Sequence, residues 1–526
     1  MADLIQLLPD AIANQIAAGE VIQRPASVVK ELMENSIDAG STSVKLIVKD
    51  AGKTLLQIID NGCGMSETDA RMAFERHATS KIRQSSDLFA IRTMGFRGEA
   101  MASIAAVAQV EMRTRRQSEE LGHRLVIEGS EIKTQEPCQG TAGTNTSVKN
   151  LFFNVPARRN FLKSNTVEMR HIIDEFQRLA IANPDIFFSL HHNNAEIFHL
   201  PPGNLRQRLI ALFGSAYNKR LVPVSEETDA LKLYGFVGKP EFAKKTRGEQ
   251  FFFVNQRFIK SGYLNHAVVS AFEDLLPADT YPFYAIFIDI DPARIDINVH
   301  PTKQEIKFED EKLVYNYLKV AIRHSLGQYS IMPTLDFDQE TSFAANRVTP
   351  AKQPGFTVDS YTRESKATAD NNSNRDINYS GEENRQQNNL DNWQRLYEGE
   401  MAFSEMTDDG EESTDSVTIE SDFSRQQRPP YQVHTSYIVS HIKSGFLLID
   451  QQAAHERILY EDFLRVLDKQ SASSQKQLFP KTIHLTVADA AMLRDIIPQI
   501  NLLGYDIQEF GQDTFVINGI PAEMGD

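Results

Sequence analysis

The clearest periodic pattern near the amino terminus lies between Pro25 and Ala39. Its apolar positions recur on one side at helical spacing: Val29, Leu32, Met33 and Ile37. Proline stands in the first turn and Gly40 follows the last residue, which are the usual signals for the start and the end of a helix. We therefore predict a helix over residues 25–39 whose apolar side faces a core.

Further segments along the chain follow strand or helix patterns. The strand-like segments are 44–48, 55–59, 284–291, 437–439, 446–449 and 514–520. Residues 101–107 and 309–328 are helix-like, and in the second of these the apolar positions are Val314, Leu318, Ile322 and Leu326. Helices and strands mixed in this order predict an α+β protein.

The pattern is lost between about residue 335 and residue 428, where Asn, Ser, Asp, Glu, Gln and Thr dominate and Trp393 is the single tryptophan. Such a composition cannot bury enough apolar surface to offset the entropy of ordering the chain. We therefore predict four parts: ordered domains at 1–204 and 205–332, a flexible acidic and polar linker at 333–428, and a further domain at 429–526. Because Asp526 closely follows a predicted strand, we expect the last domain to be truncated.

Composition narrows the class of protein. A chain of 526 residues with 41% hydrophobic and 24% charged residues is typical of a multidomain globular protein. The net charge of −16 argues against a protein that coats nucleic acid, but it leaves room for a local basic groove. Two cysteines, Cys63 and Cys138, cannot make a disulfide framework. No apolar run is long enough to cross a bilayer and no signal peptide is evident, so we expect a cytoplasmic protein with no membrane partner.

Three polar residues of the first predicted helix share one narrow arc: Glu31, Asn35 and Asp38. A carboxylate one turn away from an amide suits a hydrolase, because the carboxylate can deprotonate a water molecule and the amide oxygen can hold Mg²⁺. A solvated polar face is the commoner explanation of such a pair taken alone.

Two glycine-rich segments add groups that could surround a nucleotide. Asp60 follows the strand at 55–59 and precedes Gly62 and Gly64, so an acceptor-only side chain stands beside backbone that a ligand can approach closely. Gly95–Ala100 (GFRGEA) opens the helix at 101–107, and free N–H groups before a helix can cradle phosphates. Arg76–Lys81 (RHATSK) supplies further cations and hydroxyl groups. Singly, each segment is more often just a turn or a structural loop.

Gly52–Thr54 (GKT) resembles the tail of a P-loop, but Ile47 stands where that motif needs its first glycine. The segment also separates two predicted strands. A hairpin turn is therefore predicted here, and a Walker-type ATPase is excluded.

The order of these motifs, closed by Gly143-Thr144, resembles the nucleotide-binding motifs of GHKL ATPases. Four strings are similar to the MutL family of DNA mismatch repair proteins in particular: Gln15–Ile22 (QIAAGEVI), Arg76–Lys81, Gly95–Ala100 and Asn154–Arg159 (NVPARR). The resemblance covers residues 5–330 and implies a Bergerat-type α/β sandwich ATPase domain, then an α/β domain similar to ribosomal protein S5. It also implies a carboxy-terminal α/β dimerisation domain.

The resemblance assigns a role to each matching position. Glu31 would be the general base and Asn35 the Mg²⁺ ligand, while Asp60 would receive the adenine amino group of ATP. The residues implied around the base are Gly62, Gly64 and Thr144, and those implied around the phosphates are Thr79, Ser80, Lys81, Arg97 and Gly98. In the second domain, Asp296–Lys303 (DINVHPTK) matches a segment whose lysine reaches the γ-phosphate, which implies that role for Lys303. Phe253–Arg257 (FVNQR) resembles a second signature, although glycine is usual where Gln256 stands.

The family also implies partners: a MutS-type mismatch recognition protein, DNA, and a second copy of the chain. DNA would lie in a groove between paired arms, and ATP binding would dimerise the amino-terminal domains. The basic residues available for phosphates are Arg158, Arg159, Lys163, Arg206, Arg208, Lys219, Arg220, Lys244, Lys245, Arg247, Arg257 and Lys260. We select Arg158, Arg159, Arg257 and Lys260 as DNA contacts, against the alternative of an ordinary charged surface, and we expect association with the nucleoid during repair.

Two motifs stand in the carboxy-terminal part. Asp450–Glu461 (DQQAAHERILYE) resembles the endonuclease metal motif of nicking MutL proteins, in which Asp450 and Glu456 would bind Mn²⁺ or Zn²⁺. Gln452 replaces the histidine of that motif, and an amide is a poor ligand for a transition metal, so nicking is doubtful. Gln475–Pro480 (QKQLFP) resembles a sliding-clamp-binding motif.

Two alternative functions are considered beside mismatch repair. One is another GHKL enzyme, of the topoisomerase or chaperone class, which the RHATSK and NVPARR strings disfavour. The other is a scaffold that binds ATP as a switch without hydrolysing it.

Overall fold

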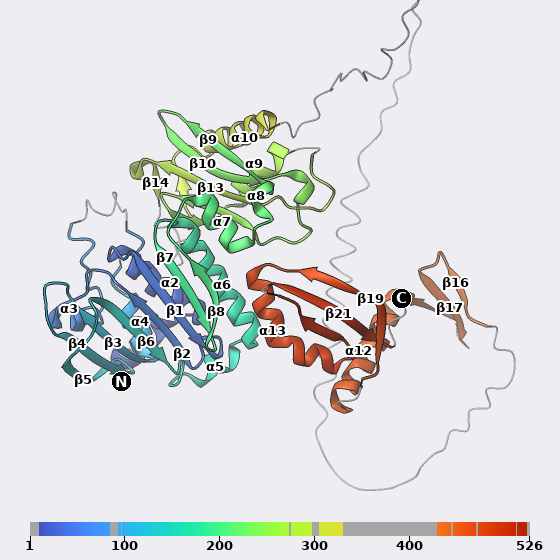
Figure 1. Ribbon diagram of the computed structural model, residues 1–526, viewed down its shortest axis with the longest axis horizontal. Coiled ribbons are helices and arrows are strands. Elements are labelled where there is room, and N and C mark those ends of the chain that lie inside the picture. The colour runs from blue at the N-terminus through green and yellow to red at the C-terminus, as the bar shows by residue number, and fades with distance from the viewer. Residues whose placement is uncertain are drawn as a thin grey trace, which may run out of the picture. The chain divides into compact units, whose positions relative to one another are not determined.

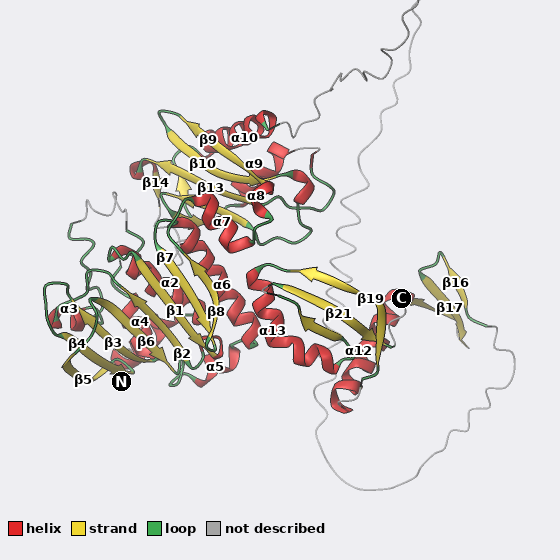
Figure 2. Cartoon of the chain, viewed as in Figure 1, coloured by secondary structure: helices red, strands yellow, loops and turns green. Residues whose placement is uncertain are grey.

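The computed structural model describes residues 10–84, 93–95, 97–272, 275–296, 305–329, 429–442, 445–469, 472–511 and 513–522. Helices and strands alternate through these residues, which confirms the α+β class (Figure 1, Figure 2). The predicted linker at 333–428, Trp393 within it, and Lys303 all lie outside the described residues.

The first domain is built on an eight-stranded sheet in the order β5-β4-β3-β6-β2-β1-β7-β8. Its strands are β1 (Ser43–Lys49), β2 (Leu55–Asp60), β3 (Gln109–Arg115), β4 (Gly122–Glu128), β5 (Glu131–Cys138), β6 (Gly143–Lys149), β7 (Phe187–His192) and β8 (Ala195–Leu200). Only β1 and β7 pair in parallel; all other neighbours are antiparallel. β1 and β2 form the predicted hairpin around Gly52–Thr54.

Helices of this domain supply the apolar cover of the sheet. They are α1 (Asp10–Val21), α2 (Pro25–Asp38), α3 (Glu67–Met72), α4 (Ala100–Val107), α5 (Pro156–Phe161) and α6 (Asn165–Ala182). In α2 the predicted apolar positions Val29, Leu32 and Met33 are buried against the alternating inward residues of the strands. The helix ends at Asp38, one residue before the predicted end, and Gly40 has the left-handed φ of +71° that glycine adopts easily.

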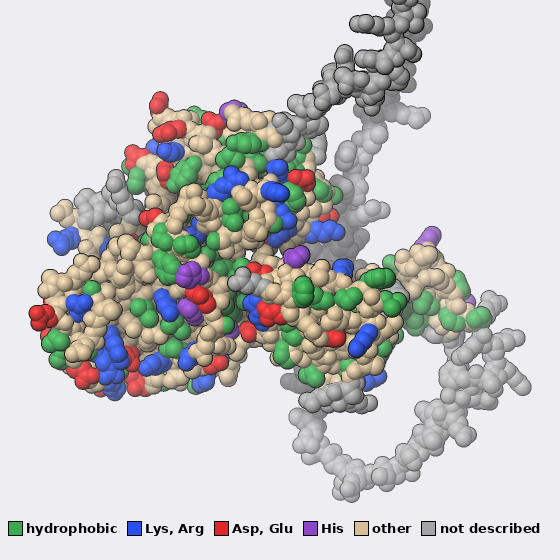
Figure 3. All heavy atoms as spheres, in the orientation of Figure 1, with side chains coloured by type: hydrophobic (Ala, Val, Ile, Leu, Met, Phe, Trp, Pro, Cys, Tyr) green, Lys and Arg blue, Asp and Glu red, His purple; other side chains and the backbone are tan. Residues whose placement is uncertain are grey.

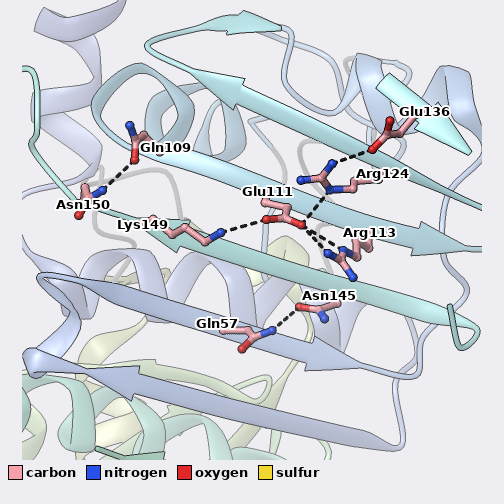
Figure 4. Close-up of polar contacts among 9 residues, drawn as sticks. All are labelled: Gln57, Gln109, Glu111, Arg113, Arg124, Glu136, Asn145, Lys149 and Asn150. Carbon is pink, nitrogen blue, oxygen red and sulfur yellow. Dashed lines mark hydrogen bonds and ion pairs between the residues drawn. The ribbon is translucent and has the colours of Figure 1, made fainter. Parts of the chain in front are cut away.

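A network of charged and amide side chains links the strands of this sheet (Figure 4). Glu111 on β3 accepts hydrogen bonds from Lys149 of β6 at 3.0 Å, from Arg124 of β4 at 3.0 Å and from Arg113 at 2.8 Å. These cations hold the pKa of Glu111 down at about 2, against the effect of partial burial. The network therefore ties three neighbouring strands together with side chains as well as with their backbones.

The second domain has a five-stranded sheet in the order β12-β11-β13-β10-β9. Its strands are β9 (Leu221–Glu227), β10 (Leu231–Gly238), β11 (Gln250–Val254), β12 (Arg257–Ile259) and β13 (Tyr284–Ile290). Its helices are α7 (Leu205–Phe213), α8 (Tyr217–Arg220), α9 (Gly262–Phe272) and α10 (Glu311–Gln328). The predicted apolar stripe of α10 is buried against α9 and the sheet, so the helical periodicity identified the core-facing side correctly.

The short strands β14 (Ile295–Asp296) and β15 (Lys307–Phe308) pair on either side of the segment that contains Lys303. The carboxy-terminal part contains two further small sheets. One consists of β16 (Tyr431–Val433), β17 (Tyr437–Ile442) and β18 (Gly445–Asp450), and the last two of these contain the strand-like segments at 437–439 and 446–449. The other consists of β19 (Ser474–His484), β21 (Thr514–Pro521) and β20 (Asp506–Glu509), with α12 (Gln451–Lys469) and α13 (Val487–Leu502) as the helices.

Candidate functional site

A cavity of about 1400 Å³ in the first domain is the candidate site. It is lined by eleven of the residues that the motifs singled out: Glu31, Asn35, Asp60, Gly62, Gly64, Thr79, Ser80, Lys81, Arg97, Gly98 and Thr144. They come from α2, from the ends of β2 and β6, and from the segments before α4. A cavity of this size exceeds the ordinary range for small-molecule sites and has room for a nucleotide and its solvent.

One side of the cavity is the polar arc of α2, which the helix presents because its other side is buried in the core. Glu31 and Asn35 lie on this arc one turn apart. Behind Glu31, Lys30 lies 3.7 Å from its carboxylate and 3.6 Å from that of Glu34. Burial opposes the charge of Lys30, but the carboxylates of Glu34 and Glu31 outweigh it and raise the pKa of this lysine.

Asp60, the last residue of β2, is held by neutral hydrogen-bond donors of the described part of the chain. Its Oδ1 accepts the backbone N–H of Gly62 at 2.9 Å and that of Thr144 at 3.2 Å. Its Oδ2 accepts the hydroxyl of Ser36 at 2.8 Å. Burial raises the pKa of Asp60 above its ordinary value, although these hydrogen bonds work in the other direction. The carboxylate is therefore fixed in direction, while no cation of the described segments is paired with it.

Two motif glycines are required by close contacts between backbones. A side chain at Gly64 would place its Cβ 2.1 Å from the carbonyl oxygen of Arg115, and at Gly98 it would lie 2.4 Å from that of Ala78. Both glycines also have positive φ, +65° and +66°. A hydrogen bond also joins the segment at 76–81 to the segment at 95–100: the backbone N–H of His77 donates to the Gly98 carbonyl at 3.1 Å.

At the other end of the cavity, an ammonium group joins two residues of α2. Lys81 Nζ donates to Asn35 Oδ1 at 3.2 Å and pairs with Asp38 Oδ2 at 2.5 Å. Asp38 also accepts the backbone N–H groups of Met94 at 2.9 Å and Gly95 at 3.0 Å. One carboxylate thus contacts both segments that border this end of the cavity.

Sequence reasoning placed Asp38 on the polar arc but gave it no role in the site, and it missed Ser36 altogether. The helical spacing was sufficient to put Asp38 beside Asn35. No local signal marks the partners of either residue, because Asp60, Lys81 and Gly95 are distant from α2 along the chain.

The structure separates the four predicted DNA contacts into different environments. Arg257 is only 7% exposed, and its Nη2 donates to the carbonyl of Thr93 at 2.9 Å. Burial lowers the pKa of its guanidinium, with Glu34 the leading opposing charge. A side chain enclosed in this way leaves little surface for a DNA phosphate, so the DNA contact at Arg257 stays a prediction that its burial disfavours.

Arg159 and Lys260 are exposed, whereas Arg158 is half-buried with its guanidinium against Gly19 of α1. Arg208, one of the wider basic set, is also interior: it is 2% exposed and donates to the carbonyls of Pro184, Ile186 and Pro201. Elsewhere, Lys and Arg side chains gather on the second domain around α8 on the face shown in Figure 3.

In the carboxy-terminal part, Asp450 ends β18 and its Oδ1 accepts the backbone N–H of Ala453 at 3.0 Å, so it caps the start of α12. Glu456 is exposed on α12, where Glu461 pairs with Arg457 at 2.8 Å. Among the described residues, no three His, Cys, Asp or Glu side chains gather as a metal site would require. In the same residues, no helix is both long and apolar enough to span a membrane.

Comparison with known proteins agrees with the fold. Residues 23–150 match the family described as "Histidine kinase-, DNA gyrase B-, and HSP90-like ATPase". A crystal structure described as the "N terminal domain of a DNA repair protein" has a TM-score of 0.53 at 24% identity, covers 61% of this chain and 99% of that chain, and supports the fold alone. The fold and the matched family define the first domain as a GHKL-type ATPase domain.

The rest of the chain narrows the family. Residues 209–327 match "DNA mismatch repair protein, C-terminal domain", and residues 431–526 match "MutL C terminal dimerisation domain". The chain is 49% identical to the DNA mismatch repair protein MutL of Flavobacterium psychrophilum, covering 100% of this chain and 86% of that protein. It is also 49% identical to MutL of Christiangramia forsetii, covering 99% and 85%. The chain belongs to the MutL family and has its role in DNA mismatch repair, which confirms the resemblance and excludes the topoisomerase and chaperone classes.

Proposed function

We propose that the cavity binds Mg-ATP and hydrolyses it, and that this cycle makes the protein an ATP-dependent clamp between mismatch recognition and strand excision. The observation that carries the proposal is the convergence of eleven motif residues, from segments far apart in sequence, on one cavity. Convergence of this kind is difficult to explain by packing alone, because most of these residues are polar.

The adenine end of the cavity is Asp60. Oδ1 is engaged by backbone N–H groups and Oδ2 accepts the Ser36 hydroxyl, so the remaining lone pair of Oδ2 is an acceptor with a fixed direction, suited to the exocyclic amino group of a purine. Gly64 and Thr144 border the same space. This arrangement selects a base with an exocyclic amino group, because a carbonyl there would face the carboxylate.

The phosphate end is formed by Asn35, Lys81 and the segment at 97–98, together with the hydroxyl groups of Thr79 and Ser80. The donor set fits magnesium: a lysine ammonium already lies on the amide oxygen of Asn35 and the carboxylate of Asp38, which are hard oxygen ligands. Bound there, Mg²⁺ would neutralise phosphate charge. Lys303 is proposed as a further phosphate contact on the ground of the family motif.

Glu31 is the proposed general base. It lies one turn before Asn35 on the same arc, so a water next to the terminal phosphate could pass its proton to this carboxylate. Glu31→Ala should bind a non-hydrolysable ATP analogue as the wild type does while its hydrolysis rate falls by about 100-fold or more. Asn35→Ala should lose the magnesium-dependent part of binding. If Glu31→Ala hydrolysed ATP at the wild-type rate, Glu31 would not be the general base.

Hydrolysis also separates the clamp from a scaffold that only binds ATP. Single-turnover measurement of phosphate release by the full chain decides between them. We propose that ATP binding orders the cavity and brings two amino-terminal domains together, and that hydrolysis releases them. Domains at 1–204, 205–332 and 429–526, joined by the linker at 333–428, would let a carboxy-terminal homodimer hold two such arms. A MutS-type protein would recruit this clamp to a mismatch.

For DNA we propose phosphate contacts at Arg159 and Lys260, keep Arg158 as the neighbour of Arg159 in the chain, and omit Arg257. Replacing both Arg159 and Lys260 by Glu should weaken DNA binding and flatten its dependence on salt concentration, because fewer counterions are released. A matched control is Lys133→Glu, which lies in the surface ion pair with Glu131. If the double variant and the control bind DNA equally well, Arg159 and Lys260 are not DNA contacts and DNA binds elsewhere on the protein.

We propose a sliding clamp as a further partner, through Gln475–Pro480. The pairing of β19 with β21 shifts register between Lys476 and Lys481, so this segment bulges from the sheet. Leu478 and Phe479 at the bulge are 94% and 88% exposed, which leaves two large apolar side chains for a groove on a partner. Leu478→Ala with Phe479→Ala should abolish binding to the clamp ring and leave ATP hydrolysis unchanged.

DNA nicking is left out of the proposal. Gln452 stands where the nicking motif has histidine, and Asp450 is engaged in capping α12. Manganese-dependent nicking of closed-circular DNA, measured for the wild type and for Gln452→His, tests this. Nicking by the wild type would show that the amide is tolerated.

A further inference from the structure

The ion pair of Lys81 and Asp38 occupies the place where the proposed magnesium ion would have to bind. Lys81 Nζ lies 3.2 Å from Asn35 Oδ1, the proposed ligand oxygen, and 2.5 Å from Asp38 Oδ2. The two side chains are 20% and 6% exposed, so solvent screens the pair only weakly. An ammonium group and a metal ion cannot share one amide oxygen, because like charges at that distance repel strongly.

The surroundings hold the ammonium group in this position. Asp38 is fixed by the backbone N–H groups of Met94 and Gly95, at 2.9 and 3.0 Å. The backbone of Gly95 passes so close that a Cβ there would lie 3.2 Å from Lys81 Nζ and 3.5 Å from Asn35 Oδ1. Glycine thus leaves the space between the lysine and the amide open, which is consistent with a cation position that must admit more than one occupant.

We propose that Lys81 is an internal cation that takes the place of magnesium before nucleotide binds, and that it yields Asn35 to the magnesium ion that arrives with the nucleotide. Asp38 is the positioning residue: it retains Lys81 near the phosphates and holds Met94 and Gly95 in both states. The proposal rests on Asn35 being the magnesium ligand. Before nucleotide binds, Lys81 then balances the charge of Asp38. Without Lys81, the buried carboxylate of Asp38 would lose the cation that offsets the free-energy cost of its burial.

The alternative is a permanent structural ion pair that has no exchange with metal. The two accounts differ in how Lys81 and magnesium depend on one another. Competing cations are coupled, so removal of one changes the effect of the other, whereas independent contacts give additive effects.

The first test uses Mg²⁺ alone, without nucleotide, and reads the melting temperature of the full chain. Wild type and Lys81→Arg should respond little, because their own cation fills the position. Lys81→Gln leaves Asp38 without a cation, so added Mg²⁺ should raise its melting temperature by several degrees. Lys133→Gln is the control, since it removes a lysine from an exposed pair of the same 2.5 Å length with Glu131. Equal responses to Mg²⁺ in all four proteins would overturn the proposal.

The second test measures binding of a non-hydrolysable ATP analogue with Mg²⁺ and with a chelator. Without metal, Lys81→Gln should bind about tenfold more weakly than the wild type, the cost of one lost bond to a charged group. With Mg²⁺ the loss should be clearly smaller, because the metal replaces the ammonium. An equal loss under both conditions would show that Lys81 acts independently of the metal.

The two failures can be told apart. If the wild type does not bind the analogue under either condition, the proposed function fails, and the Mg²⁺ melting test still reports on Lys81. If the wild type binds but the losses are additive, only the exchange between Lys81 and magnesium is wrong. Should Lys81→Gln fail to fold, Asp38→Asn in the same Mg²⁺ series tests the pair from the other side. Without its carboxylate partner Lys81 holds Asn35 less firmly, so Mg²⁺ should raise the melting temperature of this variant more than that of Lys133→Gln, and an equal response would count against exchange.

Discussion

Asp60 and Glu111 are two partly buried carboxylates on the same sheet, and their surroundings are opposite. Glu111 on β3 is bound by three cations, from Lys149, Arg124 and Arg113 (Figure 4), and its pKa falls to about 2. Asp60, at the end of β2, accepts hydrogen bonds from two backbone N–H groups and one hydroxyl, and burial raises its pKa. Both groups are well connected, yet among the residues that the structure describes only Glu111 has its charge balanced by cations.

The difference separates a carboxylate that stabilises the fold from one that is kept for a ligand. A carboxylate already paired with cations has little left to offer a nucleotide, whereas one held by neutral donors keeps an acceptor in a defined direction. The second arrangement costs stability, because a buried charge without a cation is poorly solvated. Functional groups often carry such a cost, and a raised pKa in a cavity is one sign of it.

The largest effect is expected from Asp60→Asn. The amide would keep its oxygen on the backbone N–H groups and turn its NH₂ toward the adenine amino group, so two donors would face each other. Binding of the ATP analogue should fall by about 100-fold, which corresponds to about 2.7 kcal/mol. Isothermal titration calorimetry measures the loss. Thermal unfolding should show no loss of stability, and a clear destabilisation would mean that Asp60 also supports the fold.

Glu111→Gln should have the reverse profile. The change leaves three cations close together around an amide, and the free energy of unfolding of the first domain should fall by about 1–2 kcal/mol. The expected loss of stability is small because Arg113 and Lys149 are about half exposed, at 52% and 47%, and water can solvate them after the change. Urea unfolding measures the difference, and binding of the ATP analogue should stay within error. Weaker nucleotide binding would break the distinction between the two carboxylates.

The pH dependence of stability should differ in sign between the two sites. The pKa of Glu111 is lowered from 4.5 to about 2, so its contribution is complete above pH 4.5 and is lost as the pH falls toward 2. The pKa of Asp60 is raised above 3.8, so the wild type loses stability relative to Asp60→Asn as the pH rises through that raised value. Urea unfolding of the wild type and both variants over the range of about pH 3 to 7 compares them. Parallel profiles would contradict the assignment.

The smallest effect is expected from Lys149→Gln. This change removes one of the three cations from Glu111 but leaves Arg124 and Arg113 in place. Because the lysine is half exposed, the free energy of unfolding should fall by only about 0.5 kcal/mol. A loss as large as that of Glu111→Gln would show that Lys149 alone carries the network.

Much of the fold could be predicted from local pattern. The helix α2, the hairpin of β1 and β2, and the buried stripe of α10 lie where periodicity and turn residues placed them. The motif residues around the cavity were also recognisable, because glycine is sterically required at Gly64 and Gly98 and such requirements recur as sequence motifs. These features depend on residues close together in the chain or on strict backbone geometry.

Other features were not accessible in this way. Arg257 looked like a surface cation suited to DNA, yet it is buried with its guanidinium on Thr93, which is 164 positions away. In the sequence alone, a buried arginine cannot be distinguished from one on the surface. The sequence placed Asp38 on the right side of its helix but could not show that Lys81 and the backbone at 94–95 converge on it.

The sequence by itself determined the α+β class, the helices and strands with strong periodicity, and the MutL family with its motifs, because each is encoded in short-range spacing and residue type. Only the tertiary structure decided which charges are enclosed and what they face. The balanced charge of Glu111, the unbalanced charge of Asp60 and the cation on Asn35 all arise where segments distant in the chain meet, and burial there sets the strength of every electrostatic contact.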